Sequence, residues 1–292
     1  MRASILASAL LLAPSWGFAE FVIDDAELSR SFAEKLGTMV ESSKKALDGH
    51  EASQELNRCV GKSLPLPDGA KTCAPVAGNS VYARSLPAVV AVGSVYKCGK
   101  CEHWHLGGFA TGWILSPDGL VMTNFHVLAK DDGNKIGVMT SDGEVYMATE
   151  VLAADKDGDA AIFRIDPRGK SLPCLTLGAG AEPGDEVEII SHPKGRFFCL
   201  TQGVVSRFHR QKHRGDDKVV WMSVTADFAV GSSGGPVLNS AGQVVGMVSS
   251  TLTAQTNDVA KDKPNGPSVQ MVFKDCVSLE TLRGLVKAPA AR

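Results

Sequence analysis

The feature that most constrains the fold of this chain is a succession of short Val- and Ile-rich runs separated by turn-forming glycines. Asp118-Gly119 and Asp142-Gly143 each lie between two such runs, and Asp-Gly between apolar runs favours a tight hairpin turn. We therefore predict an all-β domain of many short strands, as in sandwiches or paired barrels. Besides the runs that flank residues 142–143, the clearest are residues 88–95, 112–115, 120–124, 187–190, 203–206, 219–224, 236–238 and 243–249.

The N-terminal part has a different pattern, with apolar residues at the three-and-four spacing of an amphipathic helix. We predict a helix over residues 24–58, followed by a linker at Leu-Pro-Leu-Pro-Asp-Gly (64–69), because two prolines and a glycine interrupt both helix and strand. A short helix at residues 279–286 closes the chain. The predicted units are a helical segment with its linker (20–78), a β domain (79–285) and a C-terminal tail (286–292). One hypothesis for the helical segment is a pro-segment or a partner-binding element.

The first 19 residues resemble a signal peptide. Arg2 precedes an apolar run over residues 5–13, and small residues occupy Gly17 and Ala19, the two positions that a signal peptidase reads. The apolar run is much shorter than the roughly 20 residues that span a bilayer, so no membrane anchor is predicted. We expect a secreted or periplasmic protein.

The charge balance narrows the range of partners. The 30 Lys and Arg residues and 32 Asp and Glu residues give a formal net charge of −2, which provides no overall attraction to nucleic acid or to anionic membranes. Residues 207–214 are rich in Arg, Lys and His, and we interpret them as a solvated hairpin tip rather than a nucleic-acid patch. No nucleic-acid partner is predicted.

Seven cysteines follow the predicted signal peptide, and export permits disulfides. Because seven is odd, at least one thiol stays free or pairs between chains. The plainest pairing closes the short loop between Cys59 and Cys73, and Cys98 with Cys101 is the second.

A metal site is an alternative for the segment Cys98-Gly-Lys-Cys101-Glu-His103-Trp-His105. Its two thiols and two imidazoles are side chains that bind zinc. Zinc sites usually draw two ligand pairs from separate segments, whereas these four residues lie within eight positions. We therefore predict a local disulfide or plain thiols here, no metal and no cofactor. A metal-binding function of this segment stays open as an alternative.

The motif Gly231-Ser-Ser-Gly-Gly-Pro236 carries the clearest chemical signal. Glycines around a hydroxyl let the backbone bend so that amides converge on one point while Ser233 stays exposed. A serine hydroxyl is a poor nucleophile, so it requires a base that is itself oriented by an acceptor. His126, at the end of an apolar strand, and Asp159, at the start of another, are the candidates for these roles.

The motifs Thr-Asn-Phe-His-Val (123–127), Asp-Gly-Asp-Ala-Ala-Ile-Phe (157–163) and Gly-Ser-Ser-Gly-Gly-Pro (231–236), in this order, resemble those of chymotrypsin-fold serine proteases, most closely the HtrA-type branch. The resemblance covers about residues 79–285. It implies two six-stranded antiparallel barrels with the active site between them, and hydrolysis of peptide bonds in protein or peptide substrates. His126 then resembles the general base, Asp159 the orienting carboxylate and Ser233 the nucleophile.

The resemblance also implies an oxyanion hole at the amides of Gly231 and Ser233. Three departures from the family pattern stand out. Ser232 replaces the Asp that binds a freed N-terminus in animal trypsins, Val127 replaces their Cys, and Ala160 replaces the usual HtrA-type Leu. No PDZ domain is expected after residue 285.

Substrate binding is expected at four residues. Asp227 lies six residues before Ser233, where trypsin-like enzymes place a carboxylate at the pocket floor, and a desolvated carboxylate would select Arg or Lys. HtrA-type enzymes instead prefer small aliphatic side chains, and Phe228 and Thr251 could close a deep pocket. Ser249, with Ser250 and Thr251 after it, resembles the strand that pairs with the substrate backbone.

His192, His209 and His213 have no motif around them, and we interpret them as surface residues. The predicted function is thus a serine endopeptidase that works through an acyl-enzyme. The alternatives are a catalytically silent binding protein on the same scaffold and the metal-binding function of residues 98–105. The oligomeric state is not predicted.

Overall fold

The structure is a computed structural model that describes residues 22–43, 45–65, 73, 76–210, 218–255 and 268–287. The predicted signal peptide (1–19), most of the predicted linker, the tip of the basic hairpin with His213, and the end of the C-terminal tail lie outside these ranges.

The first of two antiparallel barrels is closed by six strands in the order β2-β3-β4-β7-β6-β5. Both predicted Asp-Gly turns join neighbouring strands of this barrel, and both glycines have positive φ, +93° at Gly119 and +77° at Gly143. The strands are β2 (Val89–Lys97), β3 (Trp104–Ser116), β4 (Leu120–Thr123), β5 (Lys135–Met139), β6 (Val145–Asp155) and β7 (Ala160–Ile165).

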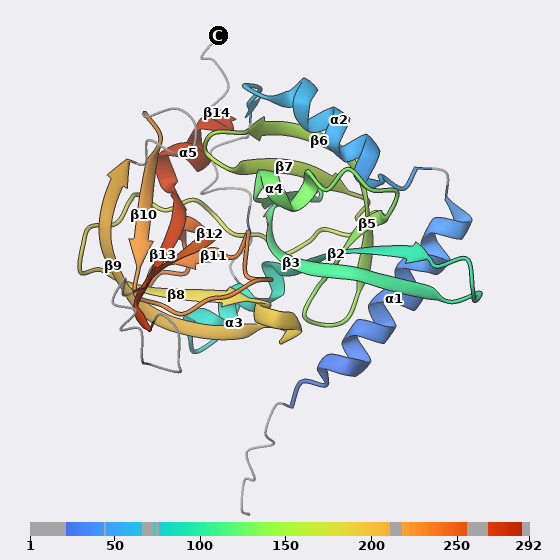
Figure 1. Ribbon diagram of the computed structural model, residues 1–292, viewed down its shortest axis with the longest axis horizontal. Helices are drawn as coiled ribbons and strands as arrows, with labels where there is room; N and C mark the ends of the chain where they lie inside the picture. Colours follow the sequence, from blue (N-terminus) through green and yellow to red (C-terminus); the bar gives the residue numbers. More distant parts are fainter. Residues whose placement is uncertain are drawn as a thin grey trace, which may run out of the picture.

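The second barrel is closed in the order β10-β13-β12-β11-β8-β9, and the two barrels lie side by side (Figure 1). The predicted double six-stranded barrel is therefore confirmed. Of the barrel strands, only β13 has no predicted counterpart, because Gln270, Lys274 and Asp275 divide its apolar residues into groups of three or fewer. The strands are β8 (Glu186–Ser191), β9 (Cys199–Arg210), β10 (Val220–Val224), β11 (Pro236–Leu238), β12 (Val244–Gln255) and β13 (Val269–Ser278).

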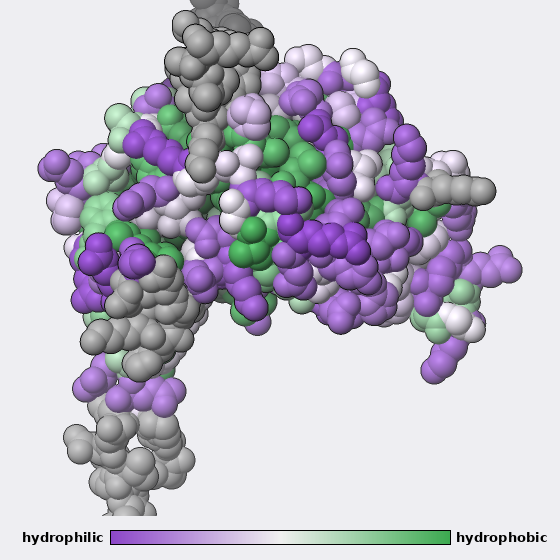
Figure 2. All heavy atoms as spheres, turned by 90° about the horizontal axis from the view of Figure 1, so that it is seen from above, coloured by the Kyte–Doolittle hydropathy of each residue, from purple (hydrophilic) through white to green (hydrophobic). Residues whose placement is uncertain are grey.

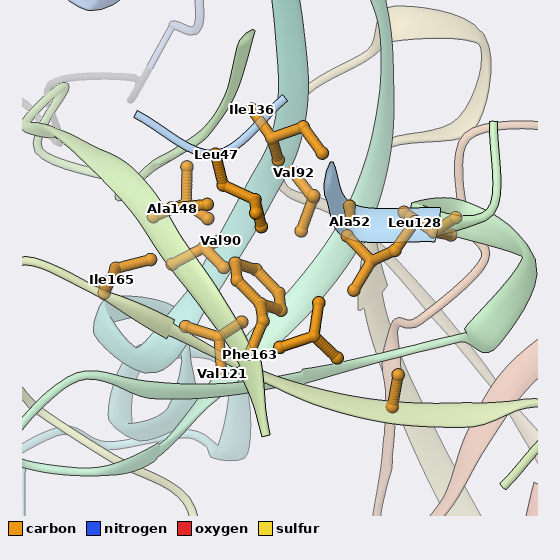
Figure 3. Packing of buried hydrophobic residues seen from close by; sticks show 14 of the residues in the cluster. Leu47, Ala52, Val90, Val92, Val121, Leu128, Ile136, Ala148, Phe163 and Ile165 are labelled. Carbon is orange, nitrogen blue, oxygen red and sulfur yellow. The ribbon is translucent and has the colours of Figure 1, made fainter. Parts of the chain in front are cut away.

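The interior of the first barrel is a close-packed apolar cluster. Phe163 of β7 is fully buried and lies near Val90 and Val121 (Figure 3). A second cluster joins the barrels, since it contains Trp113 of β3 and Trp221 of β10. Deep burial of such large side chains favours one fixed arrangement of the two barrels, because apolar burial stabilises by roughly 25 cal/mol per Å².

The single helix predicted over residues 24–58 is wrong in one respect, because the structure has two helices there. α1 (Asp25–Ser42) begins at the N-cap Asp24 and ends at Ser43. α2 (Gly49–Cys59) begins at Asp48, where Asp48 and Glu51 form a capping box. Two such caps fix two separate helix starts.

Both helices pack on the first barrel rather than standing apart from it (Figure 1). The buried face of α1 includes Phe32 and Leu36, both fully buried. A Cβ at Gly37 would lie 2.1 Å from the ring of Trp104, so only glycine admits this approach of the helix to β3. α2 packs along β6.

Short elements complete the fold. α3 (Val81–Ser85) and the 3-10 turn η1 (Leu86–Ala88) precede the first barrel. The closing helix α5 (Leu279–Gly284) ends two residues before the predicted position, and the chain continues as β14 (Val286–Lys287). β14 pairs in parallel with β1 (Leu64–Pro65), at the start of the predicted linker.

The predicted Cys59–Cys73 disulfide is wrong. Cys73 is instead bonded to Cys174, with an S–S distance of 2.01 Å. Cys59 is a buried free thiol at the end of α2, and its Sγ lies 3.4 Å from the carbonyl oxygen of Val151. Docking of α2 on β6 holds Cys59 there, which loop length in the sequence could not show.

Polar residues cover much of the face in Figure 2, with apolar areas between them. Among the helices that the structure describes, none combines the length and apolarity that a membrane crossing requires.

Candidate active site

His126 and Asp159 form one unit at the end of the first barrel. His126 lies on the one-turn helix α4 (Phe125–Leu128), which directly follows β4. Its Nδ1 lies 3.0 and 2.9 Å from the two carboxylate oxygens of Asp159, and its amide donates to Oδ1 at 3.1 Å. The imidazole is half exposed, whereas the Asp159 side chain is only 15% exposed. The carboxylate thus fixes the ring while the opposite ring edge faces the solvent.

Asp159 is held from both barrels. It occupies the turn between β6 and β7 with a φ of +53°, a conformation that Asp tolerates better than most residues. Its carbonyl oxygen accepts a hydrogen bond from Asn124 Nδ2 at 2.9 Å, and its Oδ2 accepts one from Ser249 Oγ at 2.7 Å. Ser249 belongs to β12, so this bond crosses from the second barrel to the first.

Ser249 also contacts the predicted nucleophile. Ser233 Oγ donates to the carbonyl oxygen of Ser249 at 3.2 Å. One residue of β12 therefore contacts both Asp159 and Ser233, and brings the three predicted residues to one place. No hydrogen bond joins His126 to Ser233 among the described residues.

The loop around Ser233 has the backbone that its glycines predict. Gly231 has a φ of +100° and Gly234 a φ of +87°. A Cβ at Gly234 would lie 2.0 Å from the carbonyl oxygen of Thr111, so glycine is required there. Within the described chain, the amides of Gly231 and Ser233 donate to no protein acceptor. Both are therefore free to bind an anion.

Thr111, at the centre of β3, connects the first barrel to this loop. Its amide donates to the carbonyl oxygen of Ser233 at 2.8 Å, and its Oγ1 donates to that of Gly231 at 2.8 Å. The sequence prediction missed Thr111, whose only sign is a hydroxyl within an apolar strand.

The expected surface position of His192 is wrong, because the residue is fully buried. Its amide and its Nδ1 lie 3.2 and 2.9 Å from Thr111 Oγ1. Thr111 Oγ1 has one proton, and it donates that proton to the Gly231 carbonyl oxygen. In the bond between Thr111 Oγ1 and His192 Nδ1, the proton must therefore be on Nδ1. Nε2 then bears a lone pair, and it has no hydrogen-bond partner among the described residues. Burial lowers the pKa of His192 to about 3, so the ring is neutral.

His209 is also not a surface residue. Its Nε2 lies 3.2 Å from Asp275 Oδ1, and the two side chains are 9% and 4% exposed. This pair joins β9 to β13 and includes none of the residues that contact Ser233.

The structure does not support Asp227 as a desolvated specificity carboxylate. Its side chain is 84% exposed and forms an ion pair with Lys274 of β13. A solvated and neutralised carboxylate has little selectivity for a cationic side chain. The sequence could not show this, since Lys274 lies 47 residues away along the chain.

Ser250 and Thr251 continue β12 beyond Ser249. The pairing of β11 with β12 ends at Met247, whereas on its other side β12 stays paired with β13 through Ser250 and Thr251. One edge of β12 after Val248 therefore has no β11 partner. Addition of an extended peptide to such an edge is a common recognition mode.

Cys98, Cys101 and His105 form a separate cluster at the turn between β2 and β3. The predicted Cys98–Cys101 disulfide is wrong, because the two sulfurs lie 3.5 Å apart and both thiols are free. The Lys100 amide, more than the neighbouring Cys101 thiol, lowers the pKa of Cys98 to about 7. His103 stands outside the cluster of three.

Comparison with known proteins supports the same family. The model of a trypsin-like peptidase domain matches residues 110–247. The chain is 37% identical over 139 residues to a periplasmic serine endoprotease DegP-like of Chlamydia pneumoniae, and 36% identical over 149 residues to serine protease HTRA1 of Xenopus laevis. It is 31% identical over 195 residues to a DegP-like endoprotease of Halomonas elongata.

These matches cover 47%, 49% and 66% of this chain, but only 28%, 32% and 34% of the relatives. The chain thus matches about a third or less of each relative's length. The residues matched by the family model run from within β3 to within β12 and include His126, Asp159 and Ser233. Together with the two closed barrels, these similarities show a trypsin-like peptidase domain over residues 110–247, and they support a chymotrypsin-fold serine protease of the HtrA type.

Proposed function

We propose that the protein is a secreted or periplasmic serine endopeptidase with Ser233 as nucleophile, His126 as general base and acid, and Asp159 as the orienting carboxylate. The observation that carries the proposal is the position of Ser249, which contacts Asp159 through its hydroxyl and Ser233 through its carbonyl. Contacts through Ser249 and Asp159 thereby connect three side chains from distant parts of the sequence, and acyl transfer requires such proximity.

In the proposed reaction, Ser233 Oγ forms a bond to the scissile carbonyl carbon while its proton passes to His126 Nε2. Asp159 accepts from Nδ1 and stabilises the imidazolium. The C–N bond then breaks, and the amine leaves with the proton from Nε2. A water molecule then gives a proton to His126 Nε2 and attacks the acyl carbon. The bond to Ser233 Oγ breaks, Oγ takes the proton back, and the acid is released. Ser233 Oγ must first leave the Ser249 carbonyl, which a side-chain rotation about χ1 accomplishes.

The free amides of Gly231 and Ser233 support an oxyanion hole in this proposal. Each donor of this kind contributes about 10²- to 10³-fold to turnover. The bond from Thr111 Oγ1 to the Gly231 carbonyl orients the loop that carries both amides.

A serine-directed fluorophosphonate tests the proposal. Wild-type protein should be labelled and Ser233→Ala should not. Ser232→Ala is the matched control, because Ser232 is a fully buried neighbour whose Oγ accepts from Ser191 Oγ. We expect Ser232→Ala to keep its labelling. Labelling that persists in Ser233→Ala contradicts the assignment of the nucleophile.

A second candidate function is peptide binding without turnover. The hydrogen bond from Ser233 Oγ to Ser249, in place of one to His126, favours it. A silent binder would retain extended peptides along β12, resist the fluorophosphonate and leave the peptides intact. Labelling with release of cleaved peptide excludes this candidate.

Substrate selection in the proposal depends on pocket shape rather than on Asp227. Phe228 is 9% exposed and follows Asp227 directly, while Ser249, Ser250 and Thr251 offer the strand edge for the substrate backbone. Profiling Asp227→Ser against a peptide library should leave the cleavage preference unchanged. Loss of cleavage after Arg or Lys in this variant would restore Asp227 as the selecting group.

The proposed location rests on the pattern of residues 1–19 and on the word periplasmic in the names of several relatives. N-terminal sequencing of the exported protein should begin at residue 20. Deletion of residues 20–78 tests the role of the helical segment. Because α1 and α2 cover the first barrel, we expect the deletion to lower solubility.

A further inference from the structure

The turn between β2 and β3 gathers three metal-ligating side chains outside the proposed active site. Cys98 directly follows β2, Cys101 lies in the turn, and His105 is the second residue of β3. Antiparallel pairing places His105 opposite Tyr96 and Trp104 opposite Lys97. The hairpin therefore returns the imidazole to the two thiols, although the sequence spacing alone argued against a metal site.

We propose that Cys98, Cys101 and His105 bind one zinc ion. Their ligand atoms, two Sγ and Nε2, all lie within 4.8 Å of one another. The two sulfurs are 3.5 Å apart, and Cys101 Sγ is 3.0 Å from His105 Nε2. Tetrahedral zinc with Zn–S and Zn–N bonds of usual length separates its ligand atoms by about 3.6 to 3.8 Å. Increases of about 0.3 Å for the two sulfurs and about 0.6 Å for the Sγ–Nε2 pair bring them to that geometry.

The donor set selects the class of ion. Two thiolates and one imidazole suit zinc and other thiophilic divalent cations, whereas hard cations such as Mg²⁺ and Ca²⁺ require oxygen ligands. Three protein ligands leave the fourth zinc position to a water molecule. His103 and His105 line a groove between α1 and the start of β3, so solvent reaches this side of the cluster.

The site lies where the hairpin is attached to α1. Trp104, between His103 and His105, packs against Gly37 and donates from Nε1 to Glu41 at 2.9 Å. Lys97 binds the same Glu41 at 3.0 Å and lies over the Trp104 ring. A zinc ion would link the turn to the start of β3, next to Lys97 and Trp104. It would therefore stabilise the contacts that these two residues make with α1.

Titration of the reduced, chelator-treated full chain with Co²⁺ and then Zn²⁺ tests the proposal. We expect one equivalent of Co²⁺ to produce thiolate-to-cobalt charge-transfer absorption, and Zn²⁺ to displace it. Cys98→Ser, Cys101→Ser and His105→Ala should each lose the band. Zn²⁺ should raise the Tm of the wild type and leave that of these variants unchanged, because only a metal that binds the folded state stabilises it.

Two matched controls keep the result specific. His103→Ala removes an imidazole of the same turn, and Cys199→Ser removes a free cysteine elsewhere; both should keep the band. Loss of the band in His103→Ala overturns the three-residue assignment. The proposal also fails if no band forms, if the three variants keep it, or if protein purified without reductant carries a Cys98–Cys101 disulfide.

Discussion

The two barrels differ in how their outer surfaces are covered. α1 and α2 pack over strands of the first barrel, and the Cys73–Cys174 disulfide adds a covalent tie beside its core. In the second barrel, within the described residues, the short helix α5 packs on β12 and β13 and the short helix α3 on β8, both less extensively than α1 and α2 pack on the first barrel. Large apolar residues of β9, β12 and β13 are more than a third exposed: Leu200, Phe208, Leu252, Val269, Met271 and Val272. In strands of the first barrel, only Tyr96 among described residues has such exposure.

The difference matches what each barrel contributes to the site. The first barrel supplies His126 and Asp159, whose hydrogen bonds hold the imidazole in one tautomer and one orientation. The second supplies the Ser233 loop and the edge of β12, which must stay open to an extended chain. In the proposed mechanism, the covered barrel thus holds the general base His126 and its orienting carboxylate Asp159, and the less covered barrel receives the substrate.

The largest expected effect is the loss of the orienting carboxylate. Asp159→Asn should lower kcat by about 10⁴-fold, because the amide holds the imidazole in the wrong tautomer. Asp157→Asn, in the same turn, is the control and should keep full activity. Hydrolysis of a fluorogenic peptide measures both. Equal losses in the two variants would mean that the turn, rather than the Asp159 carboxylate, matters.

Removal of the disulfide should affect the covered barrel first. Cys73→Ser opens a loop of 101 residues and should lower the free energy of unfolding by about 2 to 5 kcal/mol. Urea titration gives the free energy, and hydrogen exchange should show earlier opening in β2–β7 than in β8–β13. Cys199→Ser should change neither. Equally early exchange in both barrels would show that the disulfide does not stabilise the first barrel more than the second.

Thr111 tests the connection between the barrels. Thr111→Val keeps the shape but leaves the Gly231 carbonyl without its hydroxyl donor, and an unsatisfied buried group costs about 1 to 3 kcal/mol. We expect lower stability together with lower kcat, while Thr111→Ser restores both. If Thr111→Val has the same free energy of unfolding and the same kcat as the wild type, the hydroxyl has no positioning role.

The smallest effect at neutral pH concerns His192, whose contribution to stability depends on pH. Its pKa is about 3 in the folded protein and 6.5 as a free side chain, so between these values the unfolded chain binds the additional proton. Stability is therefore present above pH 6.5 and falls with acidification by roughly 1.4 kcal/mol per pH unit. His192→Asn should flatten this slope in urea titrations at several pH values. An unchanged slope would assign the acid sensitivity to other groups.

Much of this architecture could be predicted from local patterns. Val- and Ile-rich runs with Asp-Gly turns predict the strands of the first barrel. Three motifs predict His126, Asp159 and Ser233, of which Asp159 and Ser233 contact Ser249 and His126 contacts Asp159. The pairing of Cys73 with Cys174 and the burial of His192 depend on long-range packing, and no local pattern encodes them. The same applies to Asp227, which is neutralised by a lysine on another strand.

The parallel pairing of β1 with β14 has a consequence for processing. It joins the segment before the first barrel to the segment after the second, through the register of Leu64 with Val286. A protease that nicked the chain between residues 65 and 73 would therefore produce a two-chain complex held by backbone hydrogen bonds and by the packed faces of α1 and α2. Release of the N-terminal fragment would require the β1–β14 pairing to break as well.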